Sequence, residues 1–266
     1  IDRYRELAAR LDKVNRRIGL LAQYAPRTLH ELRSAAAERI APDEEFPAFN
    51  EAFAEDWKDQ LDGISRAMLV SGLATAASEH ISNAGWKPLL LGGVEALRIF
   101  STTSTLADTF PGLGRAKDVE MFDGMLELMY RQIEEDDPRV ISRSTFTRLL
   151  GEVLYANERT LKVPEDVILR EFGDGAMYRI QHDYEDQYSE LIWPDRLRRF
   201  KQQVDGAFVG VGIIIRHDDM RRIMIVNPLE GSPAARSGVK EGDIIVGVDG
   251  RPTTGWGLNR AVDEIT

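Results

Sequence analysis

Ser237 and Lys240 are the two residues whose types and spacing come closest to a catalytic arrangement. In penicillin-binding enzymes the pattern S-x-x-K places a serine nucleophile and a lysine base one helical turn apart. Here Gly238 lies between them, and a glycine in this context is typical of a helix end. The helical turn that would align the pair is therefore interrupted, and the sequence also contains no G-x-S-x-G motif.

The remaining polar patterns do not indicate a metal or cofactor. The four histidines (His30, His80, His182 and His217) show neither H-E-x-x-H nor a paired metal-ligand spacing. No cysteine is present, which excludes disulfides and thiolate metal sites. Gly210-Val-Gly212 lacks the third glycine and the following helix of a dinucleotide-binding fingerprint. We therefore expect no cofactor, no bound metal and no catalytic residue in this chain.

The densest structural signal runs from Gly231 to Gly250. Ser232 is expected to cap a short helix with Pro233 at its first position, and Gly238 to end that helix. A glycine turn then leads into the apolar run 244–248, which Asp249-Gly250 closes as a second turn. The sequence thus predicts helix, turn, strand and turn within twenty residues.

This string resembles the middle of a PDZ domain of the kind found in bacterial and organellar proteases. Upstream, Phe208-Val-Gly210-Val-Gly212 is similar to the F-x-G-[IV]-G start of the PDZ domain in carboxyl-terminal processing peptidases, also called tail-specific proteases. Residues 186–194 resemble the D-P-[YH]-[ST]-x-Y-[LI]-x-P segment that precedes that domain. Two positions depart from it, because Gln187 replaces the usual proline and Leu191 replaces the usual aromatic residue.

The resemblance implies a peptide-binding site. A PDZ domain binds peptides, usually C-termini, as an added strand between one strand and its last helix, while a glycine-containing loop holds the terminal carboxylate. In this chain the resemblance implies a carboxylate loop, an exposed strand edge and an apolar helix wall. The loop residues are Val209, Gly210, Val211 and Gly212; the edge residues are Ile213, Ile214 and Ile215; the wall residues are Leu258, Ala261, Val262 and Ile265. Two alternatives stay open: the glycines serve only a tight hairpin, and the wall residues belong to the core. Trp256 could likewise contact a peptide or pack on its own domain.

The resemblance also implies what surrounds this site. In that family a serine activated by a lysine lies in a domain after the PDZ domain, so we expect this chain to be an inert, substrate-recognising fragment of a serine peptidase. The PDZ domain would recruit C-terminal tails of substrate proteins and gate the protease, with residues 195–205 as the hinge. A periplasmic or otherwise extracytoplasmic location is implied as well. The alternative is a stand-alone PDZ scaffold or adaptor, whose helices dock an adaptor protein or a second copy.

Charge and composition exclude other classes. The net charge is −10, and residues 206–266 contribute −1 of it (seven Lys/Arg, eight Asp/Glu) while residues 1–205 contribute −9. An acidic body argues against nucleic-acid binding. The basic run 196–201 is better explained as one face of an amphipathic helix, because Leu197 and Phe200 interrupt it. No run of eighteen apolar residues exists, so we expect no membrane span.

Apolar spacing predicts that residues 1–205 are mostly helical. The expected helical segments are 1–25, 28–41, 49–82, 88–100, 118–137, 144–154 and 164–173, with a long loop at 101–115. Asp118 is expected to cap the fifth of these and Gly173 to end the last. From Gly206 the pattern changes to β-branched runs, with strands at 211–215 and 223–226 and a final short helix around 258–265. The predicted fold is α+β: a helical domain at 1–194, a connector at 195–205, and a small PDZ-like β-sandwich or barrel with two short helices at 206–266.

Overall fold

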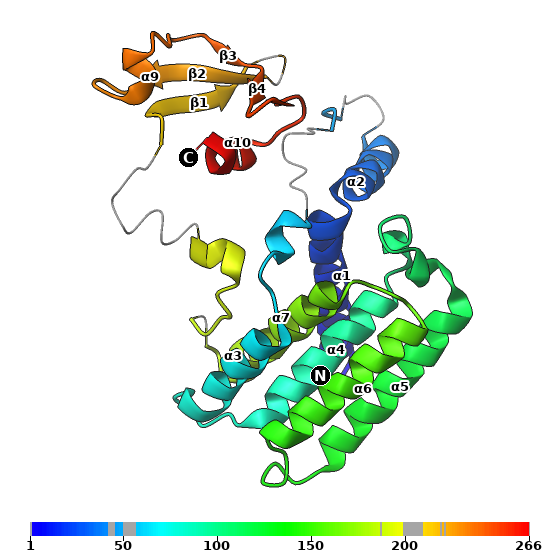
Figure 1. The fold of residues 1–266 in the computed structure, drawn as a ribbon. Coiled ribbons are helices and arrows are strands. Elements are labelled where there is room, and N and C mark those ends of the chain that lie inside the picture. Colours follow the sequence, from blue (N-terminus) through cyan, green and yellow to red (C-terminus); the bar gives the residue numbers. More distant parts are fainter. Residues whose placement is uncertain are drawn as a thin grey trace. The chain divides into compact units, whose positions relative to one another are not determined.

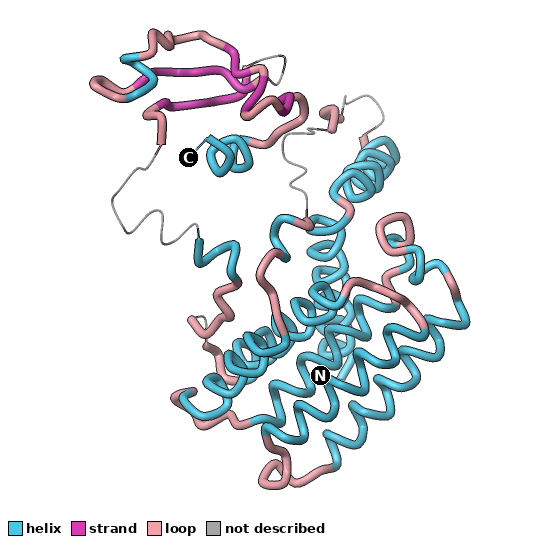
Figure 2. The backbone as a smooth tube through the Cα atoms, viewed as in Figure 1, coloured by secondary structure: helices cyan, strands magenta, loops and turns pink. Residues whose placement is uncertain are grey.

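The computed structural model describes residues 2–41, 46–49, 57–186, 188–198, 210–218, 220 and 222–265 (Figure 1). The chain divides into two compact units, Ile1–Leu29 with Leu61–Asp195 and His30–Gln60 with Arg196–Thr266. Helices make up most of the first unit, and an antiparallel sheet lies in the second (Figure 2). The predicted α+β class is confirmed.

The helices occupy most of the expected segments. They are α1 (Asp2–Tyr24), α2 (Pro26–Ile40), α3 (Arg66–Glu79), α4 (Trp86–Ser101), α5 (Ala116–Glu135), α6 (Arg143–Arg159) and α7 (Glu165–Asp183). Short 3-10 turns lie at η2 (Asp59–Leu61), η3 (Ser104–Leu106) and η4 (Pro111–Gly114), the last two within the predicted loop 101–115. Among the described helices, none is long and apolar enough to cross a membrane.

Helix α4 is the centre of the first unit. Leu89, Leu90, Val94, Leu97 and Phe100 along it are all 0% exposed. It contacts α1, α3, α5, α6 and α7, so the other helices cover it on several sides. A helix that is apolar nearly all round is stable only in such a buried position.

Helix α7 does not end at Gly173 as predicted but continues to Asp183. Its glycines are packing positions instead of a helix end: a Cβ atom on Gly173 would lie 2.8 Å from side-chain atoms of Leu191 and Trp193. A Cβ atom on Gly175 would lie 2.2 Å from the Cβ of Ala96 and 2.6 Å from the carbonyl oxygen of Gly92. Glycine is therefore needed here for helix packing, which outweighs its weak helix propensity of about 1 kcal/mol relative to alanine.

Three predicted helix starts are also corrected. Arg115, not Asp118, is the N-cap of α5, and Asp118 lies in its first turn. Helix α6 begins at Arg143, one residue earlier than expected, since Ser142 caps it in a capping box with Thr145. The segment 49–82 is not one helix in its described part: Gly63 has φ +85°, and Ser65 caps α3.

In the second unit the predicted order of helix, turn, strand and turn at 231–250 is confirmed, whereas the strand predicted at 211–215 begins only at Ile213, after Gly212 with its φ of +75°. Strands β1 (Ile213–His217), β2 (Ile223–Pro228) and β3 (Ile244–Ile245) form one antiparallel sheet in the order β1-β2-β3. Strands β4 (Gly247–Val248) and β5 (Arg251–Pro252) form a second sheet, so the apolar run 244–248 is shared between two sheets. The two short helices are α9 (Pro233–Arg236) and α10 (Leu258–Ile265).

The turns follow the chemistry that predicted them. The side chain of Ser232 accepts a hydrogen bond from the Ala235 N–H at 3.1 Å and so caps α9. Gly238 has φ +82° directly after that helix. Asp249 (φ +48°) and Gly250 (φ +76°) both adopt the left-handed conformation that a two-residue hairpin turn requires.

Candidate functional site

Strand β1 is an edge strand. One of its edges pairs with β2, and within the described residues no strand pairs with the other edge. Helix α10 contacts β1 and lies beside it (Figure 1). An edge strand exposes unpaired N–H and C=O groups, which form a template for an added strand.

The pairing of β1 with β2 shows which backbone groups point to the open edge. Ile213 lies opposite Pro228, which has no N–H, and the Leu229 N–H donates to the Gly212 carbonyl at 2.8 Å. This is the pattern of a non-hydrogen-bonded pair, in which both backbone groups of Ile213 face away from β2. At the other end of the strand, His217 pairs with Ile223, and the flanking Asp218 N–H donates to the Arg222 carbonyl at 3.0 Å. This is again the pattern of a non-hydrogen-bonded pair, so the backbone groups of His217 also face away from β2.

Ile215 follows the same alternation, because the N–H and C=O of its partner Ile225 point away from β1, toward the residues that lead into β3. Ile225 donates to Asp243 O at 2.9 Å and accepts from the Gly242 N–H at 2.8 Å. The backbone groups of Ile213, Ile215 and His217 therefore all face the open edge. This gives three successive positions at which an antiparallel peptide could pair.

The predicted carboxylate loop is held in place by its carbonyl groups. The Val211 carbonyl accepts from the Ala234 N–H at 2.8 Å, and the Gly212 carbonyl accepts from the Leu229 N–H. In a trans peptide the N–H points opposite to the C=O, and no described peptide bond is cis. The N–H groups of Gly212 and Ile213 are thus directed away from these inner partners.

Gly212 is required by both conformation and space. Its φ is +75°, and a Cβ atom there would lie 2.3 Å from the Cβ of Ser232. A side chain at this position would have to displace the cap of α9 or the loop itself. The hairpin and carboxylate interpretations both need this glycine, so its conformation alone does not choose between them.

The predicted edge and wall residues fall into different environments. Ile213 and Ile215 are half-buried, whereas Ile214 is 48% exposed. On α10, Ala261 is 0% exposed and belongs to the core with Ile223 and Trp256, while Val262 is 46% exposed. Leu258 and Ile265 are half-buried against that core. Gly210 and Val211 are half-buried before β1, and Val209 lies outside the described residues.

Trp256 packs within its own domain. Its side chain is 6% exposed, in one cluster with Ile223 and Ala261, and the Arg260 guanidinium lies 4.7 Å from the ring centroid. Of the two readings of this tryptophan, the structure favours core packing. Its backbone carbonyl lies 3.2 Å from the His217 Nε2, a contact between the end of β1 and the turn before α10. No sequence pattern indicated this pair, since the two residues are 39 positions apart.

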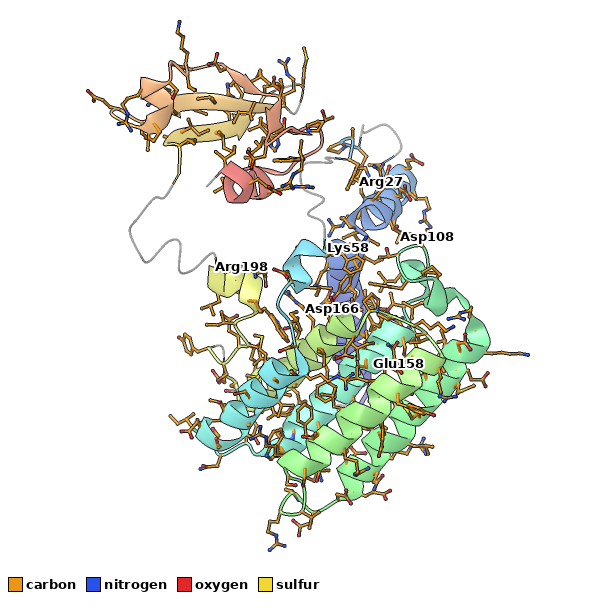
Figure 3. All side chains as sticks on the ribbon, viewed as in Figure 1. Arg27, Lys58, Asp108, Glu158, Asp166 and Arg198 are labelled. Carbon is orange, nitrogen blue, oxygen red and sulfur yellow. The ribbon has the colours of Figure 1, made fainter. Side chains whose placement is uncertain are left out.

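The segment before the sheet is anchored to α7. Trp193, which is 1% exposed, donates through Nε1 to Asp174 Oδ1 at 2.6 Å, and the Arg170 guanidinium lies 5.5 Å from its ring. Arg170 Nη1 is also 3.5 Å from Asp195 Oδ1. A helical turn at 194–198 follows, with Arg198 exposed on it (Figure 3). Leu197 is exposed as well and Phe200 lies outside the described residues, so the predicted amphipathic helix stays a prediction.

Earlier in the same segment, Asp186 organises a turn. It accepts hydrogen bonds from the N–H groups of Tyr188 at 2.8 Å and Ser189 at 3.2 Å, and it lies 3.2 Å from His80 Nε2. A hydrogen bond from the Ser189 side chain, followed by these bonds from the Tyr188 and Ser189 N–H groups and the contact with His80, lowers the pKa of Asp186 to about 2. His80 is therefore a structural partner of a carboxylate. Among the described residues no group of three or more metal-ligating side chains gathers.

Residues 199–266 match the family model described as "PDZ domain". The chain carries a PDZ domain. The match begins at residue 199, whereas the sequence pattern placed the start of the domain at residue 206.

Two relatives of this chain are named as proteases. A "Probable CtpA-like serine protease" of Staphylococcus haemolyticus (strain JCSC1435) is 32% identical over 174 residues, which are 65% of this chain and 30% of that protein. The "Carboxy-terminal processing protease CtpA" of Bacillus subtilis (strain 168) is 33% identical over 89 residues, 34% of this chain and 19% of that protein. The predicted relation to carboxyl-terminal processing peptidases is confirmed. The aligned part spans 30% or less of these two relatives.

Proposed function

We propose that the PDZ domain of this chain binds the C-terminal peptide of another protein as an additional strand on β1. The observation that carries the proposal is the open edge: the backbone groups of Ile213, Ile215 and His217 face away from β2, next to α10. The N–H groups of Gly212 and Ile213 lie at the start of this edge. They would bind the terminal carboxylate without any charged side chain.

The affinity should be modest. A few main-chain hydrogen bonds and one apolar contact surface correspond to a Kd of about micromolar or weaker, that is, about −8 kcal/mol or less favourable. Val262 is the exposed apolar residue of α10 that would contact the last peptide side chain, with Leu258 and Ile265 beside it. Ala261 would not contact the peptide directly, because it is fully buried in the core on the same helix.

The test compares one peptide with an apolar last residue as the free acid and as the C-terminal amide, titrated against the chain by fluorescence anisotropy. We expect the amide to bind about tenfold or more weakly, because a charge-assisted hydrogen bond is about twice as strong as a neutral one. Equal affinities would refute the carboxylate loop.

A matched pair of variants tests the helix wall. Val262→Glu places a charge on the exposed face of α10 and should abolish binding, whereas Val246→Glu should not. Val246 is 77% exposed and follows β3, which β2 separates from the open edge. If both variants bind equally well, the peptide does not contact α10. If both lose binding equally, the effect is not specific to α10 and the wall assignment is refuted.

We further propose that the complete protein is an extracytoplasmic serine protease and that the PDZ domain gates it. The support is the relation to CtpA-like serine proteases. Trp193 and Asp195 are tied to α7, so a hinge movement would begin after Asp195, within the predicted connector 195–205. Hydrogen exchange of the full-length protein tests this: a bound tail should change exchange in the connector, and an unchanged connector would contradict gating.

A further inference from the structure

We propose that Arg216 makes this site select an acidic side chain three residues before the last residue of the bound peptide. The inference rests on the proposed function, since it assumes that a peptide adds to the open edge of β1. It identifies a class of tail that the loop and α10 alone would not distinguish. Positions in the peptide are counted back from the last residue, which is position 0.

The side chains of β1 alternate between two faces. Ile213, Ile215 and His217 are half-buried, whereas Ile214 and Arg216 are exposed. The sheet has a bulge, but the extra residue lies on β2: Ile214 pairs with Asn227 and Ile215 with Ile225. The alternation of β1 itself is therefore regular, and Arg216 lies on the face opposite the core.

The glycine loop sets the register of an antiparallel peptide. If the N–H groups of Gly212 and Ile213 hold the carboxylate, position 0 pairs with Ile213. The second hydrogen-bonded pair then joins position −2 to Ile215, whose backbone also faces the open edge. Arg216 consequently lies opposite position −3, where directly opposed side chains share a face with Cβ atoms about 5 Å apart.

Among the described residues, Arg216 has no partner that would compete with a ligand. Its side chain makes no ion pair or hydrogen bond with any residue that the structure describes, and the residue opposite it on β2 is Met224. The nearest carboxylate along the chain, that of Asp218 just after β1, is already paired. It accepts from the Arg222 N–H at 2.8 Å and lies 2.7 Å from Arg222 Nη2, and the bond from the Arg222 backbone is the largest cause of its lowered pKa.

The expected effect is small but measurable. An exposed ion pair between opposed strands changes an affinity by about two- to fivefold, and salt weakens it. A peptide with Glu at position −3 should therefore bind about two- to fivefold tighter than the same peptide with Gln. The peptide with Lys should bind more weakly than both.

The experiment titrates the chain with these three free-acid peptides at low and high salt. In Arg216→Gln the Glu and Gln peptides should bind equally, and in Arg216→Glu the order should reverse in favour of Lys. Lys240→Glu is the control with the same change of charge. Lys240 is exposed in the loop that leads to β3, so this variant should keep the preference for Glu.

The outcomes separate this inference from the proposed function. If free acids bind better than amides but position −3 makes no difference, or if Arg216→Gln keeps the preference for Glu, the role of Arg216 is refuted while peptide binding stands. A preference that moves with Glu to position −2 would also refute it, because the register would be wrong. If amides and free acids bind equally, the carboxylate-set register is lost and both proposals fail.

Discussion

Glu171 should make the stability of the helical unit fall as pH rises. This carboxyl group lies on α7, is 7% exposed, and accepts a hydrogen bond from the Tyr24 hydroxyl of α1 at 2.6 Å. Burial, followed by the nearby charge of Asp174, raises its pKa from 4.5 to about 7, against the opposing effects of Tyr24, Arg170 and Arg16. The same burial raises the pKa of Tyr24, so Tyr24 stays the hydrogen-bond donor.

The sign and size of the effect follow from proton linkage. A carboxyl group whose pKa is raised by folding binds protons more tightly in the folded state, so its contribution is fully present below about pH 4.5. It is lost as the pH rises through about 7. The difference of about 2.5 between the two pKa values corresponds to about 3 kcal/mol, of which about 2 kcal/mol is lost by about pH 6.

Glu171→Gln tests this because glutamine has the same size, can still accept from Tyr24, and does not ionise. Urea unfolding followed by the helical circular dichroism signal should show that the variant loses this pH dependence. At about pH 8 its free energy of unfolding should exceed that of the parent chain by up to about 3 kcal/mol. Glu120→Gln, at an exposed position of α5, is the control and should leave the pH profile unchanged. If Glu171→Gln is less stable than the parent chain at every pH, the carboxylate is stabilised by its neighbours and the reasoning is wrong.

Three further predictions concern the packing of the helical unit. Gly175→Ala should lower the free energy of unfolding by about 1–3 kcal/mol, because its Cβ would lie 2.2 Å from that of Ala96. Gly151→Ala is the control: a Cβ there would have nothing within 4 Å, so this variant should raise the free energy of unfolding by up to about 1 kcal/mol. Thermal melts of both variants decide this, and equal melting temperatures would contradict the close helix crossing. Asp186→Ala should speed amide hydrogen exchange at Tyr188 and Ser189, which lose their acceptor, and unchanged exchange would show that the turn holds without it. Trp193→Phe leaves Asp174 Oδ1 without its indole donor at 2.6 Å and should destabilise the unit by about 1–3 kcal/mol, while a neutral result would mean that water replaces the bond.

The helices could be predicted because their apolar spacing is local information, but their ends depended on contacts with other helices. Gly173 appears in the sequence as a helix end. In the structure it lies inside α7, packed against the side chains of Leu191 and Trp193, and Gly175 lies two residues further along, where α4 approaches too closely for a side chain. Arg115 replaced Asp118 as the N-cap of α5 although it makes no side-chain cap bond. The exact ends of these helices therefore depend on tertiary packing, which helix propensity alone does not describe.

The C-terminal turns were predictable for the opposite reason. Ser232, Gly238 and the Asp249-Gly250 pair act through their own backbone geometry, so their roles are encoded locally. The pairing of His217 with the Trp256 carbonyl and the burial of Ala261 were not predictable in this way. Both depend on how α10 returns to β1, and periodicity identifies the apolar face of a helix without saying which of its residues stay exposed.

The string that identified the PDZ domain is also what positions its proposed carboxylate loop. The Leu229 and Ala234 N–H groups hold the carbonyls of Gly212 and Val211, and Ser232 both caps α9 and packs against Gly212. The loop is therefore oriented by the turn and helix that follow β2. In the proposed complex the loop sets the register of the bound peptide, so the same contacts would determine that Arg216 faces position −3. A substitution that shifts α9 should consequently change which peptide position is selected, even though no residue of α9 lies on the open edge.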